Sequence, residues 1–297
     1  MLEFLYKFVT PWAIANKYEI LKNRLIGVIA NWIYPIYCYI VPLKNMKKNE
    51  EAPKIIISLT SFPNRINKIH LCINSLLRQK TKADKVILWL AKEQFENRKL
   101  PHKLLNLEKK GLEIRYCDDL RSYKKIFYTA QQYTESIIVT ADDDTLYPEL
   151  WLDNLLRTHE KFDKCVVCYR AHEIIFDENK NISSYSNWNS LSPNYKGPSF
   201  NLVAIGVGGI LYPSKFFENV EFDFNTIKEI CLTTDDLWLK AISMVKGYKV
   251  VKVNENSKEW FTIKQTQKIK LASENVDNNN KNDIAMKKLI NYYNLNF

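Results

Sequence analysis

The stretch from Ser136 to Pro148, SIIVTADDDTLYP, guides the interpretation of the whole chain. It begins with a short β-branched run, Ile137–Val139, which is typical of a buried strand. Three consecutive carboxylates, Asp142, Asp143 and Asp144, follow and would repel one another without a cation. The carboxyl ends of strands bind ligands in open α/β sheets, and carboxylates there suit a divalent ion that also holds a diphosphate. The alternative is a solvated acidic turn that caps the next helix.

Strand and helix patterns alternate on both sides of this stretch. The predicted strands are Lys54–Ser61, Lys85–Leu90, Leu112–Tyr116, Ile137–Val139, Lys164–Tyr169 and Lys249–Val253. The predicted helices are Ile66–Gln79, Lys103–Lys110, Tyr123–Tyr133, Glu149–Lys161 and one that is capped by Thr233 or Thr234 and ended by Gly247. Alternation with short loops predicts a mostly parallel sheet covered on both faces. The sequence has no glycine-rich phosphate loop and no dinucleotide fingerprint.

Two later blocks carry further candidate residues. The block Ile205–Pro213, IGVGGILYP, holds three glycines and predicts either backbone pressed close to a ligand or a glycine-kinked strand. The block TTDDLWLK places Asp235 and Asp236 in the first turn of a helix. Acids there are favoured by the helix dipole alone, but a rigid helix start can also aim a carboxylate into a cleft.

Composition narrows the class of protein. The chain has 297 residues, 46% of them hydrophobic, which supports a full core. The net charge of +10 fits an anionic substrate or membrane surface better than nucleic acid, because no nucleic-acid-binding motif is present. We expect free, mostly buried thiols and a reducing, cytoplasmic compartment from the six cysteines, Cys38, Cys72, Cys117, Cys165, Cys168 and Cys231.

The two ends of the chain differ from the middle. Residues 1–50 contain an apolar, aromatic run, Leu25–Leu43, with basic residues on both sides. This pattern suits a helix that lies in the headgroup region at the inner face of a membrane, and the alternative is an ordinary helix packed on the domain. The main domain is expected to span 51–297, with a nucleotide-binding half over about 54–148 and an acceptor half over about 149–253. Residues 254–297 are expected to form a flexible C-terminal segment, because 254–283 is polar and rich in asparagine, with a final helix over Asp283–Tyr293.

Four blocks in order, IIISLTSFPNRI, IIVTADDDTLYP, GVGGILYP and TTDDLWLK, resemble a known family. The chain is similar to bacterial family-2-type glycosyltransferases with the GT-A fold, of the polysaccharide-biosynthesis type. The resemblance covers about residues 54–290 and implies the nucleotide-diphospho-sugar transferase architecture, a mostly parallel central sheet flanked by helices.

The resemblance also implies roles for individual residues. Asp144 and Asp142 would hold Mn²⁺ or Mg²⁺ as the D-x-D motif, with Asp144 as the closer ligand. Asp236 would be the catalytic base, with Asp235 as the second choice. The nucleotide and donor sugar would contact the first strand's loop, the loop after the third strand, the acidic stretch and the glycine block, that is Thr60, Ser61, Phe62, Pro63, Arg65, Asp118, Asp119, Lys124, Asp142, Asp143, Gly206, Gly208 and Gly209.

The expected activity is a metal-dependent, inverting, single transfer from a nucleotide-diphospho-sugar, with a UDP-sugar as the first choice. The acceptor would be a glycan or lipid-linked glycan in capsule or lipopolysaccharide assembly. A retaining glycosyltransferase of the same fold is an alternative, because retention does not need a base at Asp236. A catalytically silent scaffold at a membrane surface, which binds glycan or a partner protein, is a third hypothesis. A nucleotidyltransferase is the remotest, since no glycine-rich basic activation loop is present.

Overall fold

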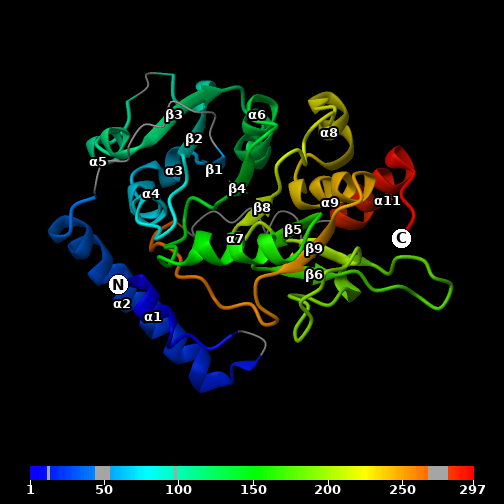
Figure 1. Ribbon diagram of the computed structural model, residues 1–297, viewed down its shortest axis with the longest axis horizontal. Helices are drawn as coiled ribbons and strands as arrows, with labels where there is room; N and C mark the ends of the chain where they lie inside the picture. Colours follow the sequence, from blue (N-terminus) through cyan, green and yellow to red (C-terminus); the bar gives the residue numbers. More distant parts are fainter. Residues whose placement is uncertain (12–13, 44–53, 97–98, 267–279) are drawn as a thin grey trace.

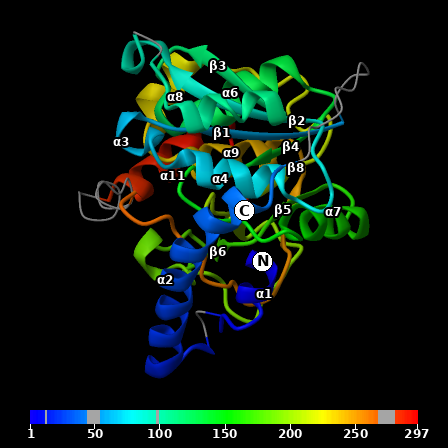
Figure 2. The same ribbon diagram turned by 90° about the vertical axis from the view of Figure 1, so that its left-hand side faces the viewer.

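The computed structural model describes residues 1–11, 14–43, 54–96, 99–266 and 280–297. A seven-stranded sheet forms the centre of the molecule (Figures 1 and 2). Its strands lie in the order β3 (Leu112–Cys117), β2 (Lys85–Ala91), β1 (Ile55–Thr60), β4 (Ile137–Thr140), β8 (Ile210–Tyr212), β5 (Cys165–Cys168) and β9 (Lys249–Lys252). β8 runs antiparallel to both of its neighbours, and the other pairs of strands are parallel. The predicted fold class, a mostly parallel α/β sheet, is confirmed.

Helices cover both faces of this sheet, as the alternating pattern predicts. Side chains of α4 (Ile69–Leu77) and α7 (Trp151–Lys161) pack with Leu59 and Val139 on one face. Side chains of α6 (Lys124–Gln132), α9 (Asp235–Val245) and α11 (Lys281–Tyr293) pack with Ile138 and Ile210 on the other. Successive residues of β4 and β8 therefore point to opposite helical layers, and both faces of the sheet are apolar because both are buried.

Shorter elements complete the domain. The helices α3 (Pro63–Ile66) and α5 (His102–Leu105) follow β1 and β2, and α8 (Phe224–Cys231) precedes α9. A separate two-stranded sheet joins β6 (Ala171–Glu173) to β7 (Leu202–Ala204). All six cysteines are free thiols, and five of them are buried, as the sequence predicts.

The C-terminal segment differs from the expected flexible stretch. Trp260, Phe261 and Ile263 are buried in the core, and α11 packs against α8 and α9. Residues 261–263 also pair with the loop that follows β4, because Leu146 N–H donates to the Phe261 carbonyl at 2.9 Å and Ile263 N–H donates to the Asp144 carbonyl at 2.7 Å. Apolar burial and paired backbone groups hold this part of a polar segment in place. Residues 267–279 lie outside the described residues.

The N-terminal residues form two helices beside the main sheet, α1 (Leu2–Tyr6) and α2 (Lys17–Ile40). A capping box starts α2, since the Asn16 side chain accepts from Glu19 N–H and the Glu19 side chain accepts from Asn16 N–H. Ala30 and Tyr34, on the inner face of α2, belong to the same apolar core as the sheet. No helix among the described residues is long and apolar enough to cross a membrane.

Candidate functional site

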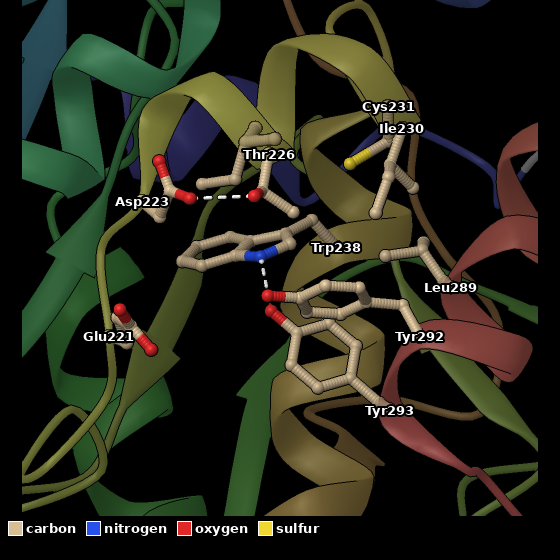
Figure 3. A pocket seen from close by; sticks show the side chains of 10 residues that line it. Glu221, Asp223, Thr226, Ile230, Cys231, Trp238, Leu289, Tyr292 and Tyr293 are labelled. Carbon is tan, nitrogen blue, oxygen red and sulfur yellow. Dashed lines mark hydrogen bonds between the residues drawn. The ribbon is translucent and has the colours of Figure 1, made fainter.

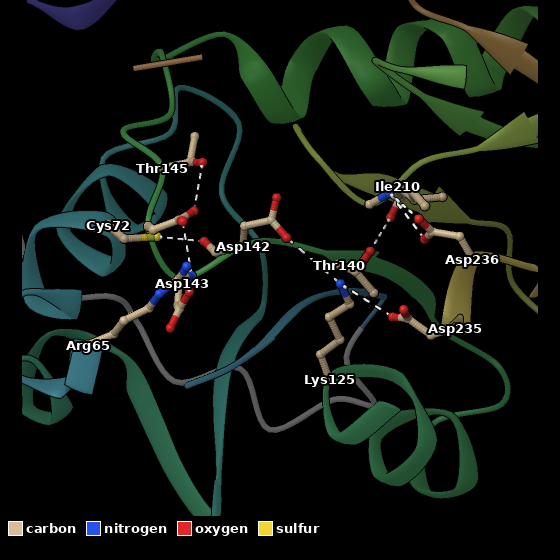
Figure 4. Close-up of polar contacts among 12 residues, drawn as sticks. Arg65, Cys72, Lys125, Thr140, Asp142, Asp143, Thr145, Ile210, Asp235 and Asp236 are labelled. Atoms are coloured by element: carbon tan, nitrogen blue, oxygen red, sulfur yellow. Dashed lines mark hydrogen bonds and ion pairs between the residues drawn. The ribbon is translucent and has the colours of Figure 1, made fainter. Parts of the chain in front are cut away.

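The three consecutive aspartates lie just beyond the carboxyl end of β4, where the chain turns away from the sheet (Figure 4). Arg65, from the helical turn after β1, contacts two of them, with Nη1 lying 2.6 Å from Asp143 Oδ1 and 3.0 Å from Asp144 Oδ2. Ser61 Oγ donates to Asp143 Oδ2 at 2.5 Å. The middle carboxylate is therefore held by the β1 loop, which leaves Asp142 facing the opposite way.

Asp142 faces a buried lysine that connects the acidic triplet after β4 to the acidic pair at the start of α9. Lys125 Nζ lies 3.8 Å from Asp142 Oδ1 and 3.7 Å from Asp235 Oδ2 (Figure 4). Burial would lower the pKa of Lys125, but Asp235 and Asp142 raise it above its ordinary value, so the side chain stays charged. The fold thus brings the acids after β4 and those at the start of α9 around one ammonium group.

The second acidic pair is fixed by the start of α9. Thr234 is the N-cap residue, and Asp235 and Asp236 occupy the first turn, as predicted. Both carboxylate oxygens of Asp236 accept from Gly206 N–H at 3.2 Å. Asp235 Oδ2 is buried and has no hydrogen-bond partner within the described residues, apart from its longer contact with Lys125.

These acids are hard to ionise in the absence of a ligand. Burial raises the pKa of Asp142 to about 6, although the charge of Lys125 opposes the shift. Burial and the neighbouring Asp235 raise the pKa of Asp236, and Lys125 and Gly206 N–H act in the opposite direction. Burial also raises the pKa of Asp143, against Arg65 and Ser61. Perturbed carboxylates gathered at one sheet edge are characteristic of a functional site.

The glycine block links the acidic triplet to the acidic pair through its backbone. Gly206 N–H bonds Asp236, and a hydrogen bond from the Gly208 backbone lowers the pKa of Asp142. Gly208 and Gly209 have φ of +90° and +97°, and a Cβ would lie 2.4 Å from Trp260 Nε1 at Gly208 and 2.5 Å from Trp151 Cζ2 at Gly209. Close packing against two indoles therefore requires these glycines. Their contact with a donor sugar stays a prediction.

The other predicted nucleotide contacts lie along the same edge of the sheet. Thr60 ends β1 and Ser61 follows it. Phe62 is the N-cap residue of α3 and Pro63 its first residue, and Arg65 lies over the Phe62 ring. Beyond β3, Asp118 pairs with Lys92, and Asp119 is held by Lys124 and by Gln94. All these groups follow parallel strands that end at one edge, so the arrangement can hold one extended ligand.

Sequence analysis missed several polar groups close to the acids. Lys125 is adjacent to the predicted Lys124, and nothing in the local pattern separates the two. Arg170 Nε, Glu259 Oε2 and Trp260 Nε1 are buried without a hydrogen-bond partner in the described part of the chain. Burial lowers the pKa of Arg170, and the charges of Asp142 and Glu259 oppose this shift, so these three side chains lie close enough to interact electrostatically. Buried polar atoms without partners call for an explanation, and a polar ligand would supply the missing hydrogen bonds.

Of the two carboxylates predicted to bind a hard divalent ion, Asp142 and Asp144, only the first is free of a close ion pair with the described residues. Mg²⁺ and Mn²⁺ in diphosphate sites are held by one or two carboxylates together with phosphate and water oxygens. Asp142 is 3.8 Å from its lysine neighbour, beyond hydrogen-bond distance, so its oxygens can reach an ion. Asp144, expected as the closer ligand, is ion-paired with Arg65. The described residues contain no cluster of three or more His, Cys, Asp or Glu that could hold a metal without a substrate.

A separate cavity lies between α8, α9 and α11 (Figure 3). It has a volume of about 60 Å³ and is lined by Trp238, whose Nε1–H donates to Tyr293 Oη at 3.1 Å. Pockets that bind small molecules usually enclose about 300–1,000 Å³. This cavity is a gap in the helix packing rather than a nucleotide site.

No protein-family model matches the sequence, and no curated protein matches it. A mannosyltransferase from Pyrobaculum calidifontis in complex with GDP-Man and Mn²⁺ aligns over 85% of this chain and 66% of its own, at 12% identity and a TM-score of 0.46. A CMP:2-keto-3-deoxy-manno-octonic acid synthetase complexed with CTP covers 67% of this chain and 88% of its own, at 10% identity and a TM-score of 0.41. A 4-diphosphocytidyl-2C-methyl-D-erythritol synthase aligns over 73% of this chain and 94% of its own, at 10% identity and a TM-score of 0.41. Likenesses this distant carry no argument about the activity of this chain.

Proposed function

We propose that this protein is a metal-dependent glycosyltransferase that moves a sugar from a nucleotide-diphospho-sugar to a hydroxyl of a glycan or lipid-linked glycan, with inversion and in a single addition. A UDP-sugar is the first donor to test, and capsule or lipopolysaccharide assembly is the pathway class that the resemblance implies. The observation that carries the proposal is the position of Lys125 between Asp142 and Asp235. It supports one site in which the diphosphate-binding acids and the acidic pair that contains the base, Asp235 and Asp236, lie on either side of a cation.

Each group has a chemical task in this proposal. Asp142 and Asp144 would hold Mn²⁺ or Mg²⁺, which neutralises negative charge that develops on the leaving diphosphate. Lys125 adds a second, permanent positive charge next to Asp142. Asp236 removes the proton from the acceptor hydroxyl, and its raised pKa matches a base that works near neutral pH. The backbone of Gly206 keeps the Asp236 carboxylate in position.

The acceptor is proposed to bind on the Trp260 side of the site. Arg170, Glu259 and Trp260 present polar atoms that the described residues leave without hydrogen bonds. Hydroxyl groups of a sugar could satisfy all three. The arginine also suits a phosphate group on a lipid-linked acceptor.

Nucleotide binding is the first test. We would titrate UDP, GDP, CDP and ADP into the protein by calorimetry, each with Mn²⁺ and with a chelator. One nucleotide that binds only with metal is the expected result, and Asp142→Asn should weaken that binding by at least about tenfold because one ion ligand is lost. Asp163→Asn, at the opposite edge of the sheet before β5, is the matched control and should bind normally.

Separate variants test the chemistry. Asp236→Asn should bind nucleotide normally and lose about 10²- to 10⁴-fold in turnover, the usual contribution of a general base. Full turnover in both Asp236→Asn and Asp235→Asn, with the anomeric configuration retained by NMR, would replace inversion with retention. Absence of binding for all four nucleotides, in protein that circular dichroism shows to be folded, would overturn the proposal and favour the scaffold. Release of pyrophosphate instead of a nucleoside diphosphate would identify a nucleotidyltransferase.

A further inference from the structure

The outer face of α2 is the most exposed apolar surface among the described residues. Of 21 large hydrophobic side chains that are exposed there, 14 lie in the first 41 residues and 10 of these are on α2. Trp32 is 69% exposed, Leu21 66% and Tyr39 90%. Exposed apolar patches of this extent mark interaction sites, since soluble surfaces otherwise scatter such residues singly.

The exposed residues form a broad stripe along one side of the helix. At about 100° per residue, they cover an arc of about 140°, from Val28 on one edge to Ile33 on the other. The opposite side carries Ala30 and Tyr34, which are packed into the core. A stripe that pairs with another helix is narrower, because a coiled-coil seam uses only two positions in each heptad. The breadth of the stripe favours a flat, extended partner.

The exposed charged residues of α2 that flank the stripe are basic. Lys17, Lys22 and Arg24 are exposed on the N-terminal half of α2. The acids of the described N-terminal part, Glu3 and Glu19, are half-buried and bonded within the protein, since Glu3 accepts from Leu150 N–H and Glu19 accepts from Asn16 N–H. A second copy of the chain would bring the same basic edge against itself, which is repulsive. An anionic surface is attracted to this edge.

We propose that α2 lies in the headgroup region of an anionic lipid bilayer, with its broad apolar stripe inserted and its basic residues on lipid phosphates. Trp32 and Tyr39 are residue types that settle at the boundary between headgroups and acyl chains. The helix is also joined to the candidate site, because Asn31 Nδ2 donates to the Thr262 carbonyl at 2.9 Å and Lys264 N–H donates to Asn31 Oδ1 at 2.8 Å. Membrane binding would therefore hold the segment 260–264, which contains Trp260, near the lipid surface.

Vesicle flotation of the full chain tests this inference without reference to turnover. We expect binding to phosphatidylcholine vesicles that contain 30% phosphatidylglycerol (about one lipid in three, as in mixed anionic bilayers) and much weaker binding to phosphatidylcholine alone. The triple variant Leu21→Gln, Leu25→Gln and Trp32→Gln should lower the partition coefficient by roughly 50-fold, because apolar insertion is lost. Its control replaces three exposed apolar residues elsewhere, Tyr195, Val245 and Ile284, by Gln and should bind as the parent does.

A second pair of variants tests the charge. Lys17→Gln, Lys22→Gln and Arg24→Gln together should weaken binding to anionic vesicles by on the order of 100-fold and leave neutral vesicles unaffected. Gln at Lys103, Lys109 and Lys161, which are exposed elsewhere, removes the same charge and should change little. Absence of binding to anionic vesicles by folded protein would overturn the inference. So would a dimer in ultracentrifugation that the apolar triple variant abolishes without any vesicle binding, which would make a second copy the partner.

Discussion

At the residue scale, burial makes the carboxylates of the site hard to ionise. Asp142, Asp143 and Asp236 all have raised pKa values because they are buried close to one another. Arg65 and Lys125 offset part of this charge. A folded state in which carboxylates bind protons more tightly than in the unfolded chain loses stability as the pH rises, so the site costs stability that a bound cation would restore.

Asp236→Asn should therefore stabilise the ligand-free protein at neutral pH. The amide oxygen can still accept from Gly206 N–H, while the buried charge disappears. We expect a gain of about 1–2 kcal/mol, or a Tm increase of several degrees, since one pKa unit corresponds to about 1.4 kcal/mol. The gain should shrink as the pH falls toward the ordinary pKa of aspartate, about 3.9. Asp236 of the parent is then protonated in the folded and the unfolded state, so the parent buries no charge there either.

Thermal melts at pH 5 and pH 8 measure this effect. Turnover of the parent should decline on the acidic side already near neutral pH, because the raised pKa of Asp236 keeps it protonated there. Asp163→Asn, an exposed carboxylate outside the site, is the control and should melt like the parent at both pH values. Equal stability of Asp236→Asn and the parent at pH 8 would show that the buried charge of Asp236 does not destabilise the protein.

At the element scale, strands were the most predictable feature. β1, β2, β3, β4, β5 and β9 begin and end within one or two residues of the predicted ranges. Most of them are short apolar runs, and polar or glycine residues mark their ends. The antiparallel direction of β8 was not predicted, since a three-residue strand carries no sign of its orientation. Lys125 was missed for a similar reason. Its partners, Asp142 and Asp235, come from two distant elements that only the folded chain brings together.

The glycine turn before β8 is the element that joins the acidic triplet to the acidic pair, and Gly208→Ala tests it. The new Cβ would overlap Trp260 Nε1 at 2.4 Å, at a φ of +90° that side chains avoid. We expect a loss of at least about 2 kcal/mol in unfolding free energy and weaker nucleotide binding, because the Gly208 hydrogen bond to Asp142 is displaced.

Gly247→Ala is a control with matched backbone strain. Gly247 also has a positive φ, +71°, but a Cβ there would meet no atom within 4 Å. It should cost about 1–2 kcal/mol from the backbone alone and leave nucleotide binding unchanged. Similar losses of stability and of binding in the two variants would show that the indole contact has no role.

At the scale of the whole molecule, the N-terminal helices are part of the domain that carries the site. Tyr6 Oη donates to the Leu146 carbonyl at 2.8 Å and accepts from Phe261 N–H at 2.8 Å, and its ring stacks on Phe261 at 4.0 Å. The N-terminal ammonium pairs with Glu149 Oε1 at 2.6 Å. Composition set these residues apart in the sequence, but the structure uses them to join the loop after the three aspartates to the segment that carries Trp260.

Tyr6→Phe should therefore affect both stability and ligand binding. It keeps the buried ring but leaves the Leu146 carbonyl and the Phe261 N–H without their shared partner, at a cost of about 2–3 kcal/mol. The Tm should fall by roughly 4–10 °C, and metal-dependent nucleotide binding should weaken, because the same loop carries Asp144. Tyr39→Phe removes a hydroxyl from a ring that is 90% exposed and should change neither quantity. Parental stability in Tyr6→Phe would mean that α1 rests on the domain without supporting it, and the N-terminal helices would then act at the lipid surface alone.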